Sequence, residues 1–210
     1  MQDTQQPDVL GLEAEAYQQG GYFNAGQARA HGVSRQLLDH HLRRGRFERV
    51  RRGLYRVQGF PAAEHDDIHE AWMAVGGADA LLSHDSALAL LDLSDNISDA
   101  VHLLVPRRRR GLHRPPGVIV HTHPDSDEVA PIWHDGLPLT APARTLLDVT
   151  DRIQPEQLSM AVEQGLRRGL LTADQLQEEA KRRHKQHAIE GVLPWLAPCA
   201  STRGTEAPRV

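Results

Sequence analysis

The sequence contains little cysteine and lysine and no long apolar run. Its single cysteine, Cys199, excludes a disulfide within the chain and fits a reducing compartment. No apolar stretch approaches the roughly 18 residues that indicate a membrane span. The N-terminus has no basic segment followed by an apolar one, so it does not resemble a secretory signal. We therefore expect a soluble cytoplasmic protein with no membrane partner.

Motifs for catalysis and cofactor binding are also missing. Gly76-Gly77 lacks the Lys-Ser/Thr pair that completes a phosphate-binding loop. The run Ser83-His84-Asp85-Ser86 has the residue types of a nucleophilic triad, but consecutive residues at a helix start cannot converge on one point. Ser83 and Asp85 are typical of helix capping instead. We expect no enzymatic activity and no cofactor.

Thirteen histidines raise the question of a metal site. His121 and His123 would point to the same face of one strand, where Asp125 or His134 could complete a ligand set. Neither a CxxC nor an HExxH element is present, and surface histidines are the simpler interpretation. The expectation is that no metal is bound.

Arginine is abundant and unevenly placed. The chain has a formal net charge of -4, yet residues 1–60 carry +3 and the remainder carries -7. Between Arg35 and Arg56 there are eight arginines and only two acids. Because duplex DNA attracts a basic face and repels an acidic body, the N-terminal segment is the predicted DNA-binding part.

The segment before Phe60 has the pattern of a helix-turn-helix. Asn24 can cap a helix that ends at His31-Gly32, and Ser34 can cap a second helix, Arg35–Arg44. A rotation of about 100° per residue separates an apolar face from a polar one. The apolar face of the second helix carries Leu37, Leu38, His41 and Leu42. Its polar face carries Gln36, Asp39, His40 and Arg43, with Arg35 at the border.

A β-hairpin, which we call the wing, is expected next. Phe47–Val50 and Leu54–Val57 flank the turn Arg51-Arg52-Gly53. The side chains expected to face the helices are Val50, Tyr55 and Val57. The side chains expected to reach outward, to phosphates or a minor groove, are Arg49, Arg51, Arg52 and Arg56.

After Phe60-Pro61 the pattern predicts a mixed α+β domain with a few short strands and C-terminal helices. The expected helices cover residues 67–75, 83–91, 155–168 and 172–187, and a further helix has Pro142 in its first turn and contains residues 144–149. The expected strands cover residues 100–105, 118–122 and 137–139. Ser83 and Thr140 are expected to cap the helices that follow them. Arg144 and Asp148, one turn apart, are expected to pair.

The fold class is therefore α+β, with a winged helix-turn-helix followed by the mixed domain. We expect the winged helix within residues 1–60, the α+β domain within 61–196, and a polar, proline-containing tail at 197–210 that does not pack.

A second basic run lies in the C-terminal part. It consists of Arg107, Arg108, Arg109 and Arg110. Three interpretations are open: a solvated turn, a second DNA contact that lengthens the footprint, and a patch for an acidic partner.

Several motifs together resemble the AbiEi antitoxins of bacterial abortive-infection systems. The motifs, between Gly21 and Leu171, are Gly21-Tyr22-Phe23, Gln27-Ala28, His31-Gly32-Val33-Ser34, Leu38, Arg49-Val50-Arg51-Arg52-Gly53-Leu54-Tyr55-Arg56, Leu82-Ser83-His84-Asp85-Ser86-Ala87-Leu88 and Arg144-Thr145-Leu146-Leu147-Asp148. The resemblance implies an autorepressor that binds inverted repeats in its own promoter and counteracts a toxin with a nucleotidyltransferase fold. In that family the winged helix carries DNA binding, and the C-terminal domain is implicated in antitoxicity and cooperative repression.

The expected partners are double-stranded DNA and the toxin. The predicted DNA-contacting residues are Ser34, Arg35, Gln36, Asp39, His40, Arg43, Arg49, Arg51 and Arg52. Among them the arginines at 43, 49, 51 and 52 suit phosphates, whereas Gln36 and His40 suit base edges. One alternative is an antitoxin that binds its toxin directly, with DNA binding secondary. Another is an enzyme, although no motif supports it.

Overall fold

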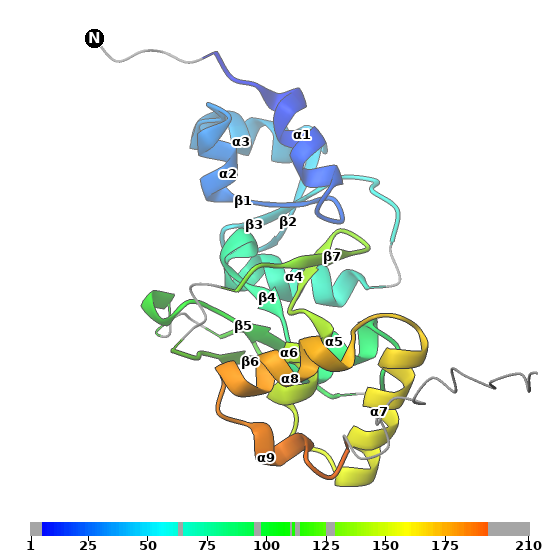
Figure 1. Ribbon diagram of the computed structural model, residues 1–210. Coiled ribbons are helices and arrows are strands. Elements are labelled where there is room, and N and C mark those ends of the chain that lie inside the picture. The colour runs from blue at the N-terminus through cyan, green and yellow to red at the C-terminus, as the bar shows by residue number, and fades with distance from the viewer. Residues whose placement is uncertain are drawn as a thin grey trace, which may run out of the picture.

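Two β-sheets with helices packed on them make up the protein (Figure 1). The computed structural model describes residues 6–62, 65–94, 98–109, 111, 114–124 and 129–192. The α+β class expected from the sequence is confirmed. Among the described residues, no helix combines the length and the apolar character needed to cross a membrane. The predicted tail, 197–210, lies outside the described residues.

The first sheet and three helices form the winged helix-turn-helix. In chain order the elements are α1 (Val9–Tyr17), β1 (Tyr22–Asn24), α2 (Ala25–Ala30), α3 (Arg35–Arg43), β2 (Phe47–Arg51) and β3 (Leu54–Val57). The sheet is antiparallel, in the order β1-β3-β2. Asn24 caps α2, since its side chain accepts hydrogen bonds from the N–H groups of Gly26 and Gln27 at 2.8 and 3.0 Å. Ser34 caps α3 by accepting from the Leu37 N–H at 3.2 Å.

A small hydrophobic cluster holds this unit together. Its members are Leu12, Ala16, Phe23, Ala28, Val33, Leu38, Phe47 and Val57. Phe23 and Phe47 meet edge to face with ring centroids 4.8 Å apart, an arrangement that aromatic quadrupoles favour. Every member precedes Phe60, and on this basis we propose that the N-terminal domain ends near that residue.

An ion pair ties α1 to the loop before the wing. Arg46 donates from Nε and Nη2 to the two carboxylate oxygens of Glu13, at 2.6 and 2.8 Å. The hydrogen bonds from Arg46 hold the pKa of Glu13 below its ordinary value of 4.5. The folded state therefore has the full benefit of the pair above that value and loses it as the pH falls through the lowered pKa.

Glu13→Gln is expected to lower the free energy of unfolding at neutral pH by about 1 kcal/mol, because Arg46 remains partly solvated. The difference from the parent chain should shrink as the pH falls through the lowered pKa of Glu13, because the carboxylate is then protonated in both states. Urea unfolding followed by circular dichroism at several pH values measures it. The matched control is Glu163→Gln, whose carboxylate is 73% exposed. A difference independent of pH would contradict the assignment.

The remaining elements build a mixed five-stranded sheet with helices. They are α4 (Asp66–Val75), η1 (Gly77–Asp79), β4 (Leu81–Leu82), α5 (His84–Leu90), β5 (Val101–Leu104), η2 (Arg107–Arg109), β6 (Val118–His121), β7 (Ile132–His134), β8 (Leu137–Leu139), α6 (Pro142–Asp148), α7 (Pro155–Arg167), α8 (Ala173–Arg182) and α9 (Gln186–Ile189). The strand order is β6-β5-β4-β8-β7. The β5–β6 and β4–β8 pairs are parallel, and the β4–β5 and β7–β8 pairs are antiparallel.

Helix α4 lies between the two sheets (Figure 1). The larger hydrophobic cluster includes Trp72 of α4 and also Tyr22 and Leu54 of the first sheet. Val50 packs against this larger cluster, so the expectation that it faces the helix-turn-helix is wrong. The sheet of the winged helix is therefore covered on both faces, since an open sheet with apolar residues on both sides must bury both.

Three local predictions are wrong. Ser83 does not cap α5; its Oγ lies 3.0 Å from Nδ1 of His84. Thr140 does not cap α6, because its Oγ1 is hydrogen-bonded to the Thr145 hydroxyl at 2.8 Å. The single helix expected over 172–187 is divided into α8 and α9, since His184 adopts a left-handed φ of 54° that a continuous helix does not allow.

Candidate nucleic-acid interface

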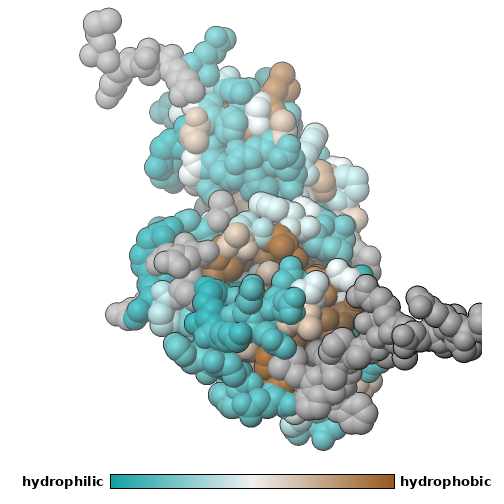
Figure 2. All heavy atoms as spheres, in the orientation of Figure 1, coloured by the Kyte–Doolittle hydropathy of each residue, from teal (hydrophilic) through white to brown (hydrophobic). Residues whose placement is uncertain are grey.

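The outer face of α3 has the predicted composition. Leu38 is buried, and Leu37, His41 and Leu42 are half-buried on the same side. The exposed side chains of α3 are Arg35, Gln36, Asp39, His40 and Arg43, and Ser34 is exposed just before them. The surface of the N-terminal unit is mainly hydrophilic in the view of Figure 2. A polar helical face of this kind, with long side chains, has the shape and chemistry to enter a major groove.

The wing is short and anchored. Gly53 adopts a φ of +79°, which lets the chain reverse after Arg52. The carbonyl of Gly53 accepts a hydrogen bond from the N–H of Ala25 at 3.0 Å, so the tip is fixed to the start of α2. Arg49 and Arg52 are exposed on this hairpin.

Three of the eight arginines between Arg35 and Arg56 are engaged inside the protein. Arg46 pairs with Glu13 at 2.6 Å, Arg56 pairs with Asp66 at 2.8 Å, and Arg51 pairs with Glu70. The guanidinium of Arg56 also lies 4.9 Å from the ring centroid of Tyr22. The expectation that Arg56 reaches outward is wrong, because Asp66 at the start of α4 neutralises it within the fold.

The other five arginines lie on α3, directly after it, and on the wing. They are Arg35, Arg43, Arg44, Arg49 and Arg52, all exposed, and none has a salt bridge to another described residue. The nearby acids Asp39 and Glu48 are exposed as well. This surface therefore keeps a net positive charge that solvent or a polyanion must balance. Arg44 was not among the predicted contacts, although its position directly after α3 could have indicated it.

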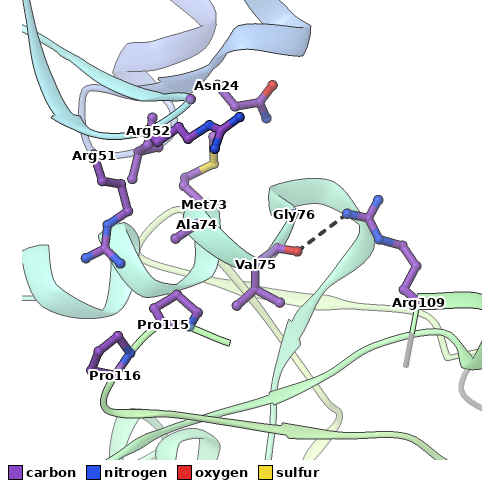
Figure 3. Close-up of a pocket in the computed structure, with 12 residues that line it drawn as sticks. Asn24, Arg51, Arg52, Met73, Ala74, Val75, Gly76, Arg109, Pro115 and Pro116 are labelled. Atoms are coloured by element: carbon purple, nitrogen blue, oxygen red, sulfur yellow. Dashed lines mark hydrogen bonds between the residues drawn. The ribbon is translucent and has the colours of Figure 1, made fainter. Parts of the chain in front are cut away.

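A cavity of about 780 Å³ lies beside the wing tip. Figure 3 shows Arg51 and Arg52 on one side of it and Arg109 on the other, beyond Val75 and Gly76. Arg109 donates from Nη2 to the carbonyl of Val75 at 3.4 Å. The wing and the second basic run are thus neighbours in space, although more than fifty residues separate them.

The second basic run is partly neutralised. Arg108 and Arg109 both pair with Asp79, at 3.2 and 2.6 Å. Arg107 is exposed, and Arg110 lies outside the described residues. The run forms the short helix η2 instead of a plain turn. A role for it in DNA contact stays a prediction.

The Arg144–Asp148 pair is confirmed, with Nε and Oδ2 at 3.6 Å, but it belongs to a larger buried group. Arg183 of the α8–α9 connection approaches the other oxygen of Asp148 at 2.5 Å. Arg144 and Asp148 are 2% and 8% exposed. Burial raises the pKa of Asp148, and the two guanidinium groups oppose that shift. This group fixes α6 against the end of α8, which is a structural role.

The histidines do not group as the sequence suggested. Strand β6 ends at His121, so His123 is not on the strand, and Asp125 lies outside the described residues. His134 is on β7, at the opposite edge of the sheet. His121 meets His84 and His102 instead. No sequence motif indicated this cluster, because its members come from three separate elements.

Comparisons with known proteins found a solved structure and a family that are similar to this chain. The structure is similar to the crystal structure of the RV2827C protein from Mycobacterium tuberculosis, with 16% sequence identity over 81% of this chain and 70% of the other, and a TM-score of 0.48. The curated proteins include no match. Residues 12–58 match the model of a family described as "Transcriptional regulator, AbiEi antitoxin". The resemblance to AbiEi antitoxins is thus confirmed for the winged helix.

Proposed function

We propose that this chain is an AbiEi-type antitoxin and transcriptional autorepressor that binds inverted repeats in its own promoter and counteracts a nucleotidyltransferase toxin. The observation that carries the proposal is the set of five exposed arginines, on α3, directly after it and on the wing, that have no salt bridge to another described residue. All five arginines fall within the segment that matches the regulator family. We propose that the chain acts by binding and not by catalysis.

In this proposal the contacts divide by chemistry. Arg43, Arg49 and Arg52 neutralise phosphates and set the register of the domain on the duplex. Arg51 contributes less to phosphate binding than the sequence suggested, because its ion pair with Glu70 partly neutralises its charge. Gln36 and His40 face the base edges, where an amide can bind adenine through two hydrogen bonds. The remaining predicted contacts are Ser34, Arg35 and Asp39.

Fluorescence anisotropy with the duplex upstream of the chain's own gene tests DNA recognition. We expect this duplex to bind at least about 1,000-fold more tightly than a scrambled duplex of equal composition at physiological salt. Equal affinities for the two duplexes would remove autorepression from the proposal. They would leave only the electrostatic attraction that any basic surface has for DNA.

Gln36→Ala and His40→Ala are expected to relax sequence choice without changing the salt dependence of binding. Each substitution should reduce discrimination against a mismatched base pair by about 1–3 kcal/mol at one operator position, because the hydrogen bond to a base edge is lost. Anisotropy over a set of single-mismatch duplexes measures this. The matched control is Gln157→Ala on α7, where discrimination should be unchanged. Uniform weakening on all duplexes would instead place both side chains on the DNA backbone.

Antitoxicity is assigned in this proposal to the part of the chain after Phe60, which carries a net charge of -7. An acidic surface is unsuited to DNA and suits a protein partner, so direct binding of the toxin is the second candidate. Coexpression of the chain with the nucleotidyltransferase toxin that the proposal requires, followed by co-purification, distinguishes direct binding of the toxin from an indirect mechanism. A stable complex supports direct binding. Rescue of growth without a complex supports an indirect mechanism.

A further inference from the structure

Three histidines converge between α5 and the β5–β6 edge of the larger sheet. His84 is the first residue of α5, His102 is on β5, and His121 ends β6. One ring nitrogen from each lies within 4.8 Å of the other two. Nε2 of His121 is 3.1 Å from Nδ1 of His102. The rings of His84 and His121 are stacked, with centroids 3.6 Å apart.

The outward nitrogens of two of these rings already have oxygen partners. Nε2 of His102 lies 3.4 Å from Oδ2 of Asp85, and Arg152 donates to the same oxygen at 2.9 and 3.2 Å. Asp85 is thus not a helix cap, as the sequence suggested; its carboxylate accepts hydrogen bonds from Arg152 and lies beside His102. Nδ1 of His84 lies 3.0 Å from the Ser83 hydroxyl. Carboxylate or hydroxyl partners on the far nitrogen are the usual support of metal-bound imidazoles, since they fix the tautomer and the ring orientation.

The positions of these rings are unusual for a core. His102 is 1% exposed and lies on the same strand as the buried Leu103 and Leu104. An apolar side chain would be buried there at a lower desolvation cost. His84 adopts a φ of 50°, the left-handed region that side chains rarely occupy. Such a conformation costs on the order of 1–3 kcal/mol and is concentrated at ligand sites.

The imidazoles are in the form that binds metals. Burial lowers the pKa of His84 to about 2 and that of His121 to about 4, and it also lowers the pKa of His102. All three are neutral at pH 7, with lone pairs available to an ion. The cluster belongs to the larger sheet, whereas α3 lies in the N-terminal unit above it (Figure 1).

We propose that His84, His102 and His121 bind one transition-metal ion, Zn²⁺ in the first instance. The ligand atoms are Nδ1 of His102 and Nε2 of His121 and His84. Two nitrogens on a tetrahedral zinc at about 2.05 Å are about 3.3 Å apart, so the 3.1 Å between His102 and His121 already approaches that spacing. Rotation of His84 out of the stack brings its lone pair onto the ion. Three imidazoles select Zn²⁺, Co²⁺, Ni²⁺ or Cu²⁺ over Mg²⁺ or Ca²⁺, and leave a fourth position for water.

Tag-free, chelator-treated protein titrated with Zn²⁺ against a chromophoric chelator tests the proposal. We expect one ion per chain with a dissociation constant below about 1 µM. His84→Gln/His121→Gln should weaken binding at least about 100-fold, more than the loss expected from an outer partner. Asp85→Asn, which leaves all three ligands, should weaken it about 10–100-fold. His134→Gln, a histidine on β7, is the matched control and should bind like the parent chain.

Co²⁺ added to the unsubstituted protein gives a readout that does not depend on any variant. Tetrahedral coordination by three imidazoles produces visible absorption bands that octahedral aqueous Co²⁺ lacks. Absence of these bands overturns the proposal, even where the double variant fails to fold. Micromolar binding that survives in a folded double variant overturns it as well, because the ion would then occupy another site.

Discussion

Replacing Arg43, Arg49 and Arg52 together by alanine is expected to weaken binding to every duplex by about 100-fold at about 0.15 M salt. Each phosphate contact contributes about 0.9 to the slope of log K against log salt, so three contacts account for about two decades at that concentration. The slope itself should fall by nearly 3. Anisotropy titrations of operator and scrambled duplexes over a salt series measure both quantities.

The choice of these three arginines follows from the structure. All three are exposed and form no salt bridge with another described residue, so their removal leaves no buried carboxylate behind. Arg51 is excluded, because its loss would also release Glu70 on α4. Arg167→Ala is the control, since its side chain is 71% exposed on α7. An unchanged salt slope in the triple variant would remove α3 and the wing from the DNA interface.

The same triple variant separates the two proposed activities. Expressed from an unrelated promoter, it should still protect cells from the toxin, because antitoxicity is assigned to the part after Phe60. Loss of protection by a folded triple variant would mean that the winged helix also takes part in countering the toxin. Growth measurements on cells that carry the inducible toxin decide between these outcomes.

Asp148→Asn is expected to cost about 3–5 kcal/mol in the free energy of unfolding, the largest stability effect among our predictions. The substitution keeps the shape of the side chain but leaves Arg144 and Arg183, 3% and 4% exposed in their side chains, without their shared carboxylate. Arg144 keeps the Glu179 carboxylate at 4.0 Å, but loss of the Asp148 charge leaves the two buried guanidinium groups poorly compensated for their desolvation. For a chain of this size the melting temperature should fall by about 10 °C.

Urea unfolding followed by circular dichroism measures the effect. The control is Asp151→Asn, whose carboxylate is 79% exposed and bonds Lys185 at 2.9 Å. A loss below about 1 kcal/mol is expected there, because water replaces the pair. Equal losses in the two variants would contradict the buried-charge explanation. Combining Asp148→Leu with Arg144→Met and Arg183→Met should recover much of the stability, since no buried charge then lacks a partner.

Local sequence patterns predicted the helix-turn-helix well. Asn24 and Ser34 cap the helices as expected, and Leu38 is buried while Gln36 and His40 are exposed. These features depend on neighbours within one or two helical turns, so the sequence contains the necessary information. The Arg144–Asp148 pair was predictable for the same reason.

Features that depend on distant segments were not predictable. The strands β1, β4 and β7 have only two or three residues, and their pairing defines them more than their composition does. Asp148 has a second partner, Arg183, which lies thirty-five residues later in the connection between α8 and α9.

By itself the sequence determined that a basic helix-turn-helix precedes an acidic α+β part, because charge and local periodicity belong to the chain. Only the tertiary structure decided which arginines remain available, since Glu13, Glu70 and Asp66 reach three of the eight from other elements. The histidine cluster was likewise created by the packing of α5 on β5 and β6. Ion pairs and ligand sets act over a few ångströms in space, and that proximity exists only after distant segments have packed.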